Sequence, residues 1–194
     1  MIYMIYIKKI TAAVLLCAGL LFFGGCGGGE NGANYASHYT AKELADAIMS
    51  AYGPSELPEE GFEYFYSGAD EDSDYYIDAY FAGLLINGAY SPLEEYENIS
   101  DCAFYVPKGR NIFEVVVLKS EKSGGDDIKL LQDVLNRRLE RKTSSDVLVY
   151  TPEDAPLLEN AKIITAGNYV IFLATNDNKK AEQMINDMLL ADGD

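Results

Sequence analysis

The stretch DCAFYVPKGRNIFEVVVL, residues 101–118, predicts two strands joined by a turn. Apolar and β-branched residues fill both halves, and Lys108-Gly109-Arg110 between them is typical of a tight turn. A helix is expected next, over residues 126–142, because four apolar residues recur at the spacing of one helix face. These residues are Ile128, Leu131, Leu135 and Leu139.

The same order of elements follows a second time in the C-terminal part of the chain. Residues 161–166 and 169–175 predict two strands around a tight turn at Gly167-Asn168, and residues 178–190 predict a helix. Two strand–turn–strand–helix units favour an α+β domain. We expect N-terminal helices followed by a mainly antiparallel, four-stranded sheet with helices on one face.

Helix signals also occur before the first strand pair. Thr40 and Glu43 form a capping box, and Gly53-Pro54 ends the helix that it begins. Residues 54–74 are acidic and marked by proline and glycine, which is typical of a loop. A second helix is expected over residues 74–87.

Three shorter elements complete the expected order. Ser91-Pro92-Leu93-Glu94 predicts a helix start, since serine caps helices and proline suits their first turn. Between the two strand–turn–strand–helix units, residues 147–150 predict a short strand. Thr151-Pro152-Glu153-Asp154 then predicts the cap of a short helix.

The N-terminus has the pattern of a cleaved export signal. Lys8 and Lys9 precede an apolar run of 14 residues, 10–23, and the small residues Gly24-Gly25 follow it. A membrane-spanning helix needs about 20 apolar residues, so the run favours a signal peptide over a spanning helix.

Cys26, directly after the two glycines, resembles the cysteine of a bacterial lipobox, with Phe23 where that pattern usually has leucine. The resemblance implies that Cys26 receives a lipid and becomes the N-terminus of a lipoprotein on the outer face of the cell membrane. The alternative is an ordinary cut nearby that leaves an inert thiol. Cys17 does not suit the pattern, because Leu16 precedes it where a small residue is needed. The expected parts are a signal peptide (1–25), a glycine-rich tether (26–37) and a single α+β domain (38–194).

After the leader the chain is strongly acidic. The whole sequence has a net charge of −16, and two of its 15 basic residues but none of its 31 acidic ones precede Cys26. The remaining part therefore has 13 basic and 31 acidic residues, a net charge of −18. This charge repels the phosphates of nucleic acids and anionic lipids, so it argues against a nucleic-acid partner and favours solubility.

Three short strings connect the chain to a family: residues 113–119 (FEVVVLK), 137–140 (RRLE) and 167–173 (GNYVIFL). Together with the order of elements over residues 74–190, they resemble a family of small lipoproteins from Gram-positive, clostridia-type bacteria. That family is catalogued as a domain of unknown function. The resemblance implies export and lipidation, and it supplies no catalytic residues.

The best candidate metal cluster consists of Asp70, Asp72, Asp74 and Asp78. The first three have the spacing that opens an EF-hand calcium loop, where a hard cation binds several carboxylate oxygens. The pattern then breaks, because Tyr75 stands where the loop needs glycine and Phe81 where it needs a bidentate glutamate. The alternative is a solvated acidic loop whose last residue caps a helix.

Tyrosines give a second candidate site. The part after the leader has thirteen of them, and the chain has no tryptophan. Tyrosine combines an apolar ring with a polar hydroxyl, which suits ligand grooves and interfaces, although half-buried tyrosines are also common in small domains. The possible ligand is an envelope protein, a peptide or a cell-wall component. The expected ligand-binding surface contains Tyr64, Tyr66, Tyr75, Tyr76 and Tyr80.

The one basic cluster of the sequence consists of Arg137, Arg138, Arg141 and Lys142. These residues fall in the last turns of the helix expected over 126–142, where cations stabilise the helix dipole. A solvated helix end and a docking patch for an acidic partner, such as a wall polymer, are the two interpretations.

The sequence contains no catalytic set with a histidine at its centre. His38 is the sole histidine and lies beside the tether, so neither a Ser-His-Asp triad nor a Cys-His pair is expected. Cys102 falls in an apolar strand and is expected to be a buried, inert thiol. These features favour a membrane-anchored binding or interaction module without a cofactor. The alternative is an envelope hydrolase that uses carboxylates, with or without a metal at the Asp70 cluster.

Overall fold

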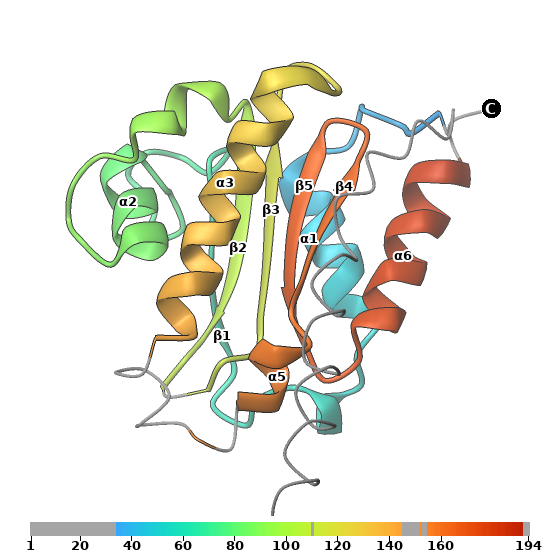
Figure 1. The fold of residues 1–194 in the computed structure, drawn as a ribbon. Helices are drawn as coiled ribbons and strands as arrows, with labels where there is room; N and C mark the ends of the chain where they lie inside the picture. The colour runs from blue at the N-terminus through green and yellow to red at the C-terminus, as the bar shows by residue number, and fades with distance from the viewer. Residues whose placement is uncertain (1–33, 110, 145–151, 153–154, 192–194) are drawn as a thin grey trace, which may run out of the picture. The chain divides into compact units, whose positions relative to one another are not determined.

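The computed structural model describes residues 34–109, 111–144, 152 and 155–191. In this part a five-stranded sheet lies between helices (Figure 1). Its order is β1-β2-β3-β5-β4, and every neighbouring pair is antiparallel. The α+β class and the antiparallel pairing are thus confirmed, whereas the prediction of four strands is wrong. The strands are β1 (Phe62–Tyr66), β2 (Asp101–Pro107), β3 (Glu114–Lys119), β4 (Lys162–Ala166) and β5 (Tyr169–Ala174).

β1 is the strand that was expected to be a loop. It pairs with β2 so that Phe62 lies opposite Pro107 and Tyr66 opposite Ala103. Its sequence, FEYFY, is rich in the aromatic residues that strands favour, but it is only five residues long. The prolines, glycines and acidic residues around it dominate a sequence window of ordinary length, so the loop pattern hides the strand.

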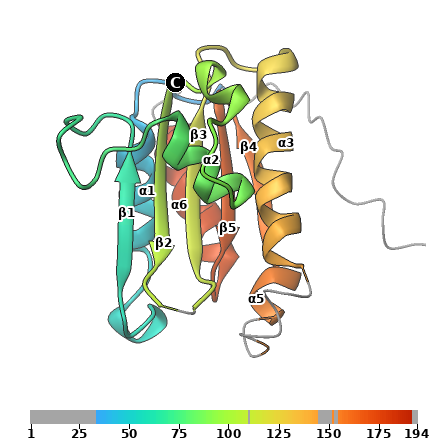
Figure 2. The ribbon, with the colours of Figure 1, turned by 90° about the vertical axis from the view of Figure 1, so that its left-hand side faces the viewer.

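Helices cover both faces of the sheet. α1 (Ala41–Ser50) and α6 (Asn178–Ala191) pack on one face, and α2 (Ala79–Asn87) and α3 (Gly125–Lys142) pack on the other, as Figure 2 shows. Three short helices complete this part of the chain: the 3-10 helices η1 (Pro54–Glu56) and η2 (Glu94–Asn98), and α5 (Ala155–Glu159).

The prediction that helices cover one face is wrong because the central strands are buried on both sides. In β3, Val116 and Leu118 pack with α2 and α3, while Val115 and Val117 pack with α1 and α6. All six residues of β5 are buried as well. A strand covered on both faces carries consecutive apolar residues, whereas a strand covered on one face alternates. The unbroken apolar runs in β3 and β5 were therefore the sequence signal for two helical layers.

The starts of α1 and α2 follow from their caps. The Thr40 hydroxyl accepts the Glu43 N–H at 3.1 Å and the Glu43 carboxylate accepts the Thr40 N–H at 2.8 Å, which confirms the capping box. The second helix was expected from residue 74 but begins at Ala79. The Asp78 carboxylate, on extended backbone, accepts the Phe81 N–H at 2.8 Å and caps the helix there.

The other predicted elements have mixed outcomes. The four strands and two long helices of the repeated units begin and end within two residues of their predicted limits. The helix predicted to start at Ser91 is instead the 3-10 helix η2, which begins at Glu94 after Leu93. The strand predicted at 147–150 lies outside the described residues, as do the leader and Cys26.

The described part of the domain includes Asn34, four residues before the domain was expected to start at residue 38. Ala36 is buried and donates its N–H to the Leu189 carbonyl in α6 at 2.8 Å. Among the described residues, no helix has the length and apolar character needed to span a bilayer.

A tyrosine platform at the edge of the sheet

Four tyrosine rings gather where the edge strand β1 meets β2 and helix α1. Tyr64 and Tyr66 come from β1, and their spacing of two places them on one face of the strand. Tyr105 lies opposite Tyr64 in the register of β2. Tyr75 comes from the segment that leads from β1 to α2. We call these four residues the tyrosine platform.

Tyr64 is the centre of the platform. Its ring stacks on that of Tyr75 at 4.5 Å between centroids and 8° between planes. The rings of Tyr66 and Tyr105 lie at 6.2 and 5.7 Å from it, also nearly parallel. Offset, parallel rings at these distances attract one another beyond their shared burial. The stack therefore holds its outermost ring, Tyr75, which is 45% exposed, in a defined orientation.

Helix α1 braces the platform from one side. The Tyr105 hydroxyl donates to one Asp46 oxygen at 2.5 Å, and the Lys42 ammonium donates to the other at 2.5 Å. The Lys42 nitrogen also lies 5.3 Å from the ring centroid of Tyr66 and 5.8 Å from that of Tyr64, a cation–π distance. One carboxylate thus positions both a ring and a cation at the same surface.

At neutral pH, Lys42 is protonated and the hydroxyl groups of Tyr64 and Tyr105 are neutral. The hydrogen bond with Asp46 raises the pKa of Lys42. Burial raises the pKa of Tyr105, and its hydrogen bond with Asp46 raises it further. Hydrogen bonding with Tyr75 raises the pKa of Tyr64. This part of the surface therefore has the Lys42 ammonium, paired with Asp46, beside the neutral phenols of Tyr64 and Tyr105.

A groove runs beside the platform along β1. Its volume is about 300 Å³, and it is lined by residues 62–65, Asp74, Tyr75 and Lys108. Tyr64 and Tyr75 belong to both the groove and the platform. A ligand in the groove would therefore contact the stacked rings.

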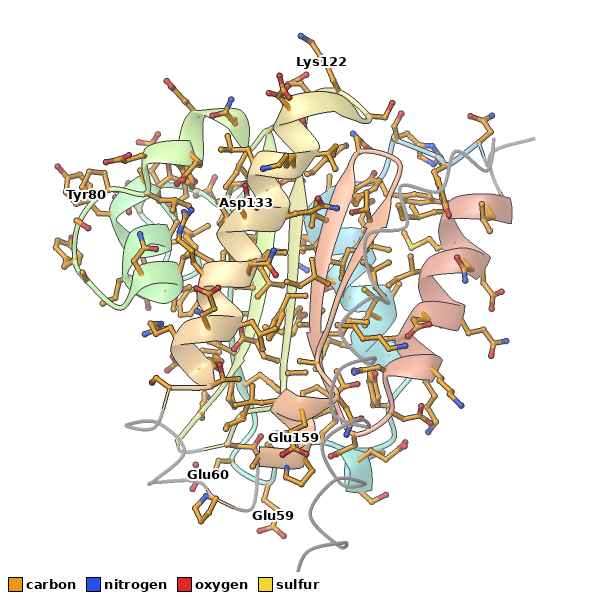
Figure 3. The ribbon with its side chains drawn as sticks, viewed as in Figure 1. Glu59, Glu60, Tyr80, Lys122, Asp133 and Glu159 are labelled. Atoms are coloured by element: carbon orange, nitrogen blue, oxygen red, sulfur yellow. The ribbon has the colours of Figure 1, made fainter. Side chains whose placement is uncertain are left out.

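The expected tyrosine surface is only partly formed. Tyr64, Tyr66 and Tyr75 come together, whereas Tyr76 and Tyr80 are not among the stacked rings. Tyr76 forms a backbone bridge with Tyr66, and Tyr80 lies on α2, where its ring is 5.7 Å from that of Tyr90 (Figure 3). Two tyrosine groups therefore replace the single predicted one.

Sequence reasoning missed Tyr105, Lys42 and Asp46. Lys42 and Asp46 are four residues apart in a predicted helix, which is the spacing of a side-chain pair, so that signal was visible. Tyr105 lies in a predicted strand, but its partner Tyr64 could be recognised only if β1 was known to be a strand.

The four aspartates are spread along the acidic segment. Asp78 caps α2, as its position before a helix predicts. The Asp70 carbonyl accepts the Ser73 N–H in a turn, and Asp74 lines the groove beside β1. Asp72 is exposed. Within residues 34–109, 111–144, 152 and 155–191, no group of three acidic, histidine or cysteine side chains is placed to hold a metal ion.

Both interpretations of the basic cluster are wrong for Arg138 and Lys142, whose side chains are largely buried, and all four side chains have partners within the protein. Arg138 is 2% exposed and pairs with Glu114, which is 0% exposed on the central strand β3. Lys142 pairs with the same carboxylate. Arg141 donates to the Leu85 carbonyl at the end of α2 at 2.5 Å, and Arg137 pairs with Glu95 at 2.9 Å.

Glu114 is charged in this arrangement. Burial alone would raise the pKa of its carboxyl group, but Arg138 and Lys142 outweigh burial and hold that pKa below its usual value. Arg138 also donates to the Leu85 carbonyl, so it joins β3, α2 and α3. The ion group is therefore part of the core, and we assign it a structural role.

Cys102 is fully buried on β2. Burial raises the pKa of its thiol to about 12, so the thiolate that reacts as a nucleophile does not form near neutral pH. The buried position agrees with the expectation of an inert thiol.

A second hollow, of about 510 Å³, lies near the turn between β4 and β5 and is mainly polar. Lys119 in its wall donates to the Tyr39 carbonyl at 2.8 Å, and Asp101 accepts from the Ala41 N–H at 2.7 Å and from the Ser67 hydroxyl at 2.6 Å. Its charged groups thus hold the N-terminal segment and α1 against the sheet.

Comparison with protein-family models, curated proteins and solved structures gave no match for this chain. Of the two hollows, the one beside the tyrosine platform has an exposed aromatic ring, Tyr75, in its wall.

Proposed function

We propose that this chain is a membrane-anchored, extracytoplasmic lipoprotein whose folded domain binds an envelope protein, a peptide or a cell-wall component on the tyrosine platform. The leader and Cys26 support the anchor. The resemblance of three short strings to clostridia-type lipoproteins agrees with the anchor, and we propose membership of that family as well.

One observation carries the binding role: Tyr75 is 45% exposed yet held by the stack of rings that Asp46 and Lys42 brace. An exposed aromatic ring that already has a defined orientation loses little conformational entropy when a ligand binds. Tyrosine provides a large contact area and a hydroxyl for hydrogen bonding at that low entropic cost. An isolated surface tyrosine lacks this support.

Replacing Cys26 with serine is expected to move the protein from the membrane fraction to the soluble exported fraction. The hydroxyl of serine cannot take the thioether-linked lipid, and each CH₂ withdrawn from the bilayer removes about 0.8 kcal/mol of membrane binding. Cell fractionation and labelling with a radioactive fatty acid measure the change. Cys17→Ser is the matched control and should stay in the membrane. Membrane retention and lipid labelling of Cys26→Ser would contradict the anchor.

Replacing Tyr75 with alanine is expected to weaken ligand binding about tenfold, the effect of losing roughly 1.4 kcal/mol from a central aromatic contact. The measurement is the dissociation constant of the full-length protein in detergent for insoluble wall sacculi, soluble wall fragments and short extended peptides. At least one of these probes should bind.

Tyr90→Ala is the control for Tyr75→Ala. Tyr90 is 75% exposed, and its ring lies in a tilted contact with that of Tyr80 rather than with the platform. Its removal should leave binding unchanged. Equal effects of the two substitutions, or no binding of any probe by the unmodified protein, would refute a binding role for the platform.

A further inference from the structure

The outer edge of β1 has backbone groups without a backbone partner among the described residues. Lys108 donates to the Gly61 carbonyl at 3.0 Å, and Ser67 donates to the Cys102 carbonyl at 3.1 Å. In an antiparallel pair the bonded positions alternate, so residues 61, 63, 65 and 67 bond toward β2. The N–H and C=O groups of Phe62, Tyr64 and Tyr66 therefore point away from the sheet.

This outer edge already accepts a short piece of strand at one end. Tyr66 donates its N–H to the Tyr75 carbonyl at 2.9 Å, and Tyr66 and Tyr76 form a parallel bridge. Over the described residues, no backbone group pairs with the outward groups of Phe62 and Tyr64. Figure 2 shows β1 at the border of the sheet, with the segment that follows it near its C-terminal end.

The 300 Å³ groove lies along these unpaired groups, since residues 62–65 form one of its walls and Tyr75 another. It therefore offers two kinds of contact to a chain lying in it. The backbone of Phe62 and Tyr64 supplies donors and acceptors in the plane of the sheet. The rings of Tyr64 and Tyr75 supply apolar area beside them.

The charges around the groove select among possible chains. Glu63 and Asp74 are exposed in its walls, and Glu59 and Glu60 are exposed just before β1 begins, where Figure 3 labels them. Lys108 is the one cation among the described residues that line the groove. An excess of carboxylates favours a positively charged segment. It also disfavours a second copy of this chain, which has the same acidic edge.

We propose that the groove binds an extended, lysine- or arginine-containing segment of a partner protein, which adds to β1 as a sixth strand. The inference rests on the proposed function, because it assigns a ligand class to the same surface. Strand addition obtains affinity from main-chain hydrogen bonds and specificity from side-chain contacts. Hydrogen bonds to the backbone of Phe62 and Tyr64 would supply the affinity. The acidic side chains around the groove and the tyrosine rings would supply the specificity.

The test uses the full-length protein in detergent and the peptide acetyl-Lys-Thr-Val-Thr-Val-Lys-amide, which has high strand propensity and two positive charges. Binding is measured by fluorescence anisotropy. The same peptide with N-methyl groups on every amide of its four central residues has the same charge and side chains but lacks those donors on both edges. We expect it to bind at least about tenfold more weakly, because it loses hydrogen bonds to β1.

Two variants at one position test the edge from the protein side. Tyr64→Ala removes the ring, while Tyr64→Pro removes the ring and the outward N–H. Proline is tolerated on an edge strand where the N–H faces away from the sheet. The peptide should bind Tyr64→Pro about tenfold more weakly than Tyr64→Ala. If Tyr64→Pro does not fold, the methylated peptide still decides the question on the unmodified protein.

The outcomes separate the two proposals. Equal affinity for methylated and unmethylated peptide, or for the two Tyr64 variants, would overturn strand addition. If wall fragments bind the platform and the peptide does not, strand addition fails while the proposed function stands. Concentration-dependent dimers in sedimentation, abolished by Tyr64→Pro and unaffected by peptide, would overturn the assigned partner in favour of a second copy.

Discussion

Replacing Arg138 with methionine is expected to lower the free energy of unfolding by about 3–5 kcal/mol, the usual loss when one member of a buried ion group is removed. The reason is the position of its partner, because Glu114 is 0% exposed in the middle of the sheet. Without Arg138, Lys142 is the remaining cation beside that carboxylate, and the Leu85 carbonyl loses a donor. Urea unfolding at neutral pH measures the change.

Arg137→Met is the matched control for Arg138→Met. Arg137 is the neighbour in sequence, but its side chain is 38% exposed and pairs with Glu95 at the surface. Solvent screens such a pair, so its loss should change stability by less than about 1 kcal/mol. Similar losses from the two substitutions would contradict the assignment of Glu114 and Arg138 to the core.

The pH dependence gives a second measurement on the same ion group. Because the folded protein holds the pKa of Glu114 below its usual value, the group stabilises the fold above the unfolded pKa, about 4.3. That contribution falls as the pH drops through the lower, folded pKa. Arg138→Met removes one of the two cations that lower the pKa of Glu114 in the folded protein. The acid-induced loss of stability should then begin at a higher pH than in the unmodified protein.

Replacing Gly83 with alanine is expected to destabilise the protein by about 1–3 kcal/mol, the usual effect of overpacking. Gly83 lies inside α2, where alanine would normally add about 0.5–1 kcal/mol. Here a Cβ atom would stand 1.8 Å from the Ser91 carbonyl oxygen and 3.1 Å from the Leu93 nitrogen. Both are backbone atoms, and Leu93 is held by its bond to the Ala79 carbonyl at 2.8 Å. The close contact therefore outweighs the gain in helix propensity.

Gly53→Ala is the control for Gly83→Ala. Gly53 has a φ of −73°, which suits any residue, and the nearest atom to an added Cβ is a Glu56 carboxylate oxygen at 3.5 Å. Thermal unfolding should show a stabilisation of about 0.4–1 kcal/mol, since alanine restricts the unfolded chain. If Gly83→Ala were stabilising too, the contact between α2 and residues 91–93 would have to be looser than described.

Local patterns predicted most of the elements, because the interactions that end them are local. The Thr40 capping box and the turn at Gly167-Asn168 each involve residues close together in the sequence. Pairing across the sheet is different. Residues 114–119 of β3 pair with residues 169–174 of β5, and both strands have apolar runs. The pattern within either strand contains no information about which strand lies beside it.

The candidate site was predicted in part for the same reason. Tyr64, Tyr66 and Tyr75 are close in sequence, so composition alone indicated them. Tyr105 and Asp46 are 59 residues apart and meet because α1 packs on the face of β2 that carries Tyr105. The basic cluster was misinterpreted because nothing near it in the sequence reveals that Glu114 lies buried opposite α3.

The first and last helices of the domain, α1 and α6, are neighbours, and this affects how the chain can fold while it emerges from the ribosome. α1 packs against α6, and Ala36 is bonded to Leu189, so two segments separated by nearly the whole domain complete one face of the sheet. During synthesis from the N-terminus, the apolar stripe of α1 lacks part of its cover until residue 189 has emerged. The final cooperative step of folding therefore waits for the C-terminal helix.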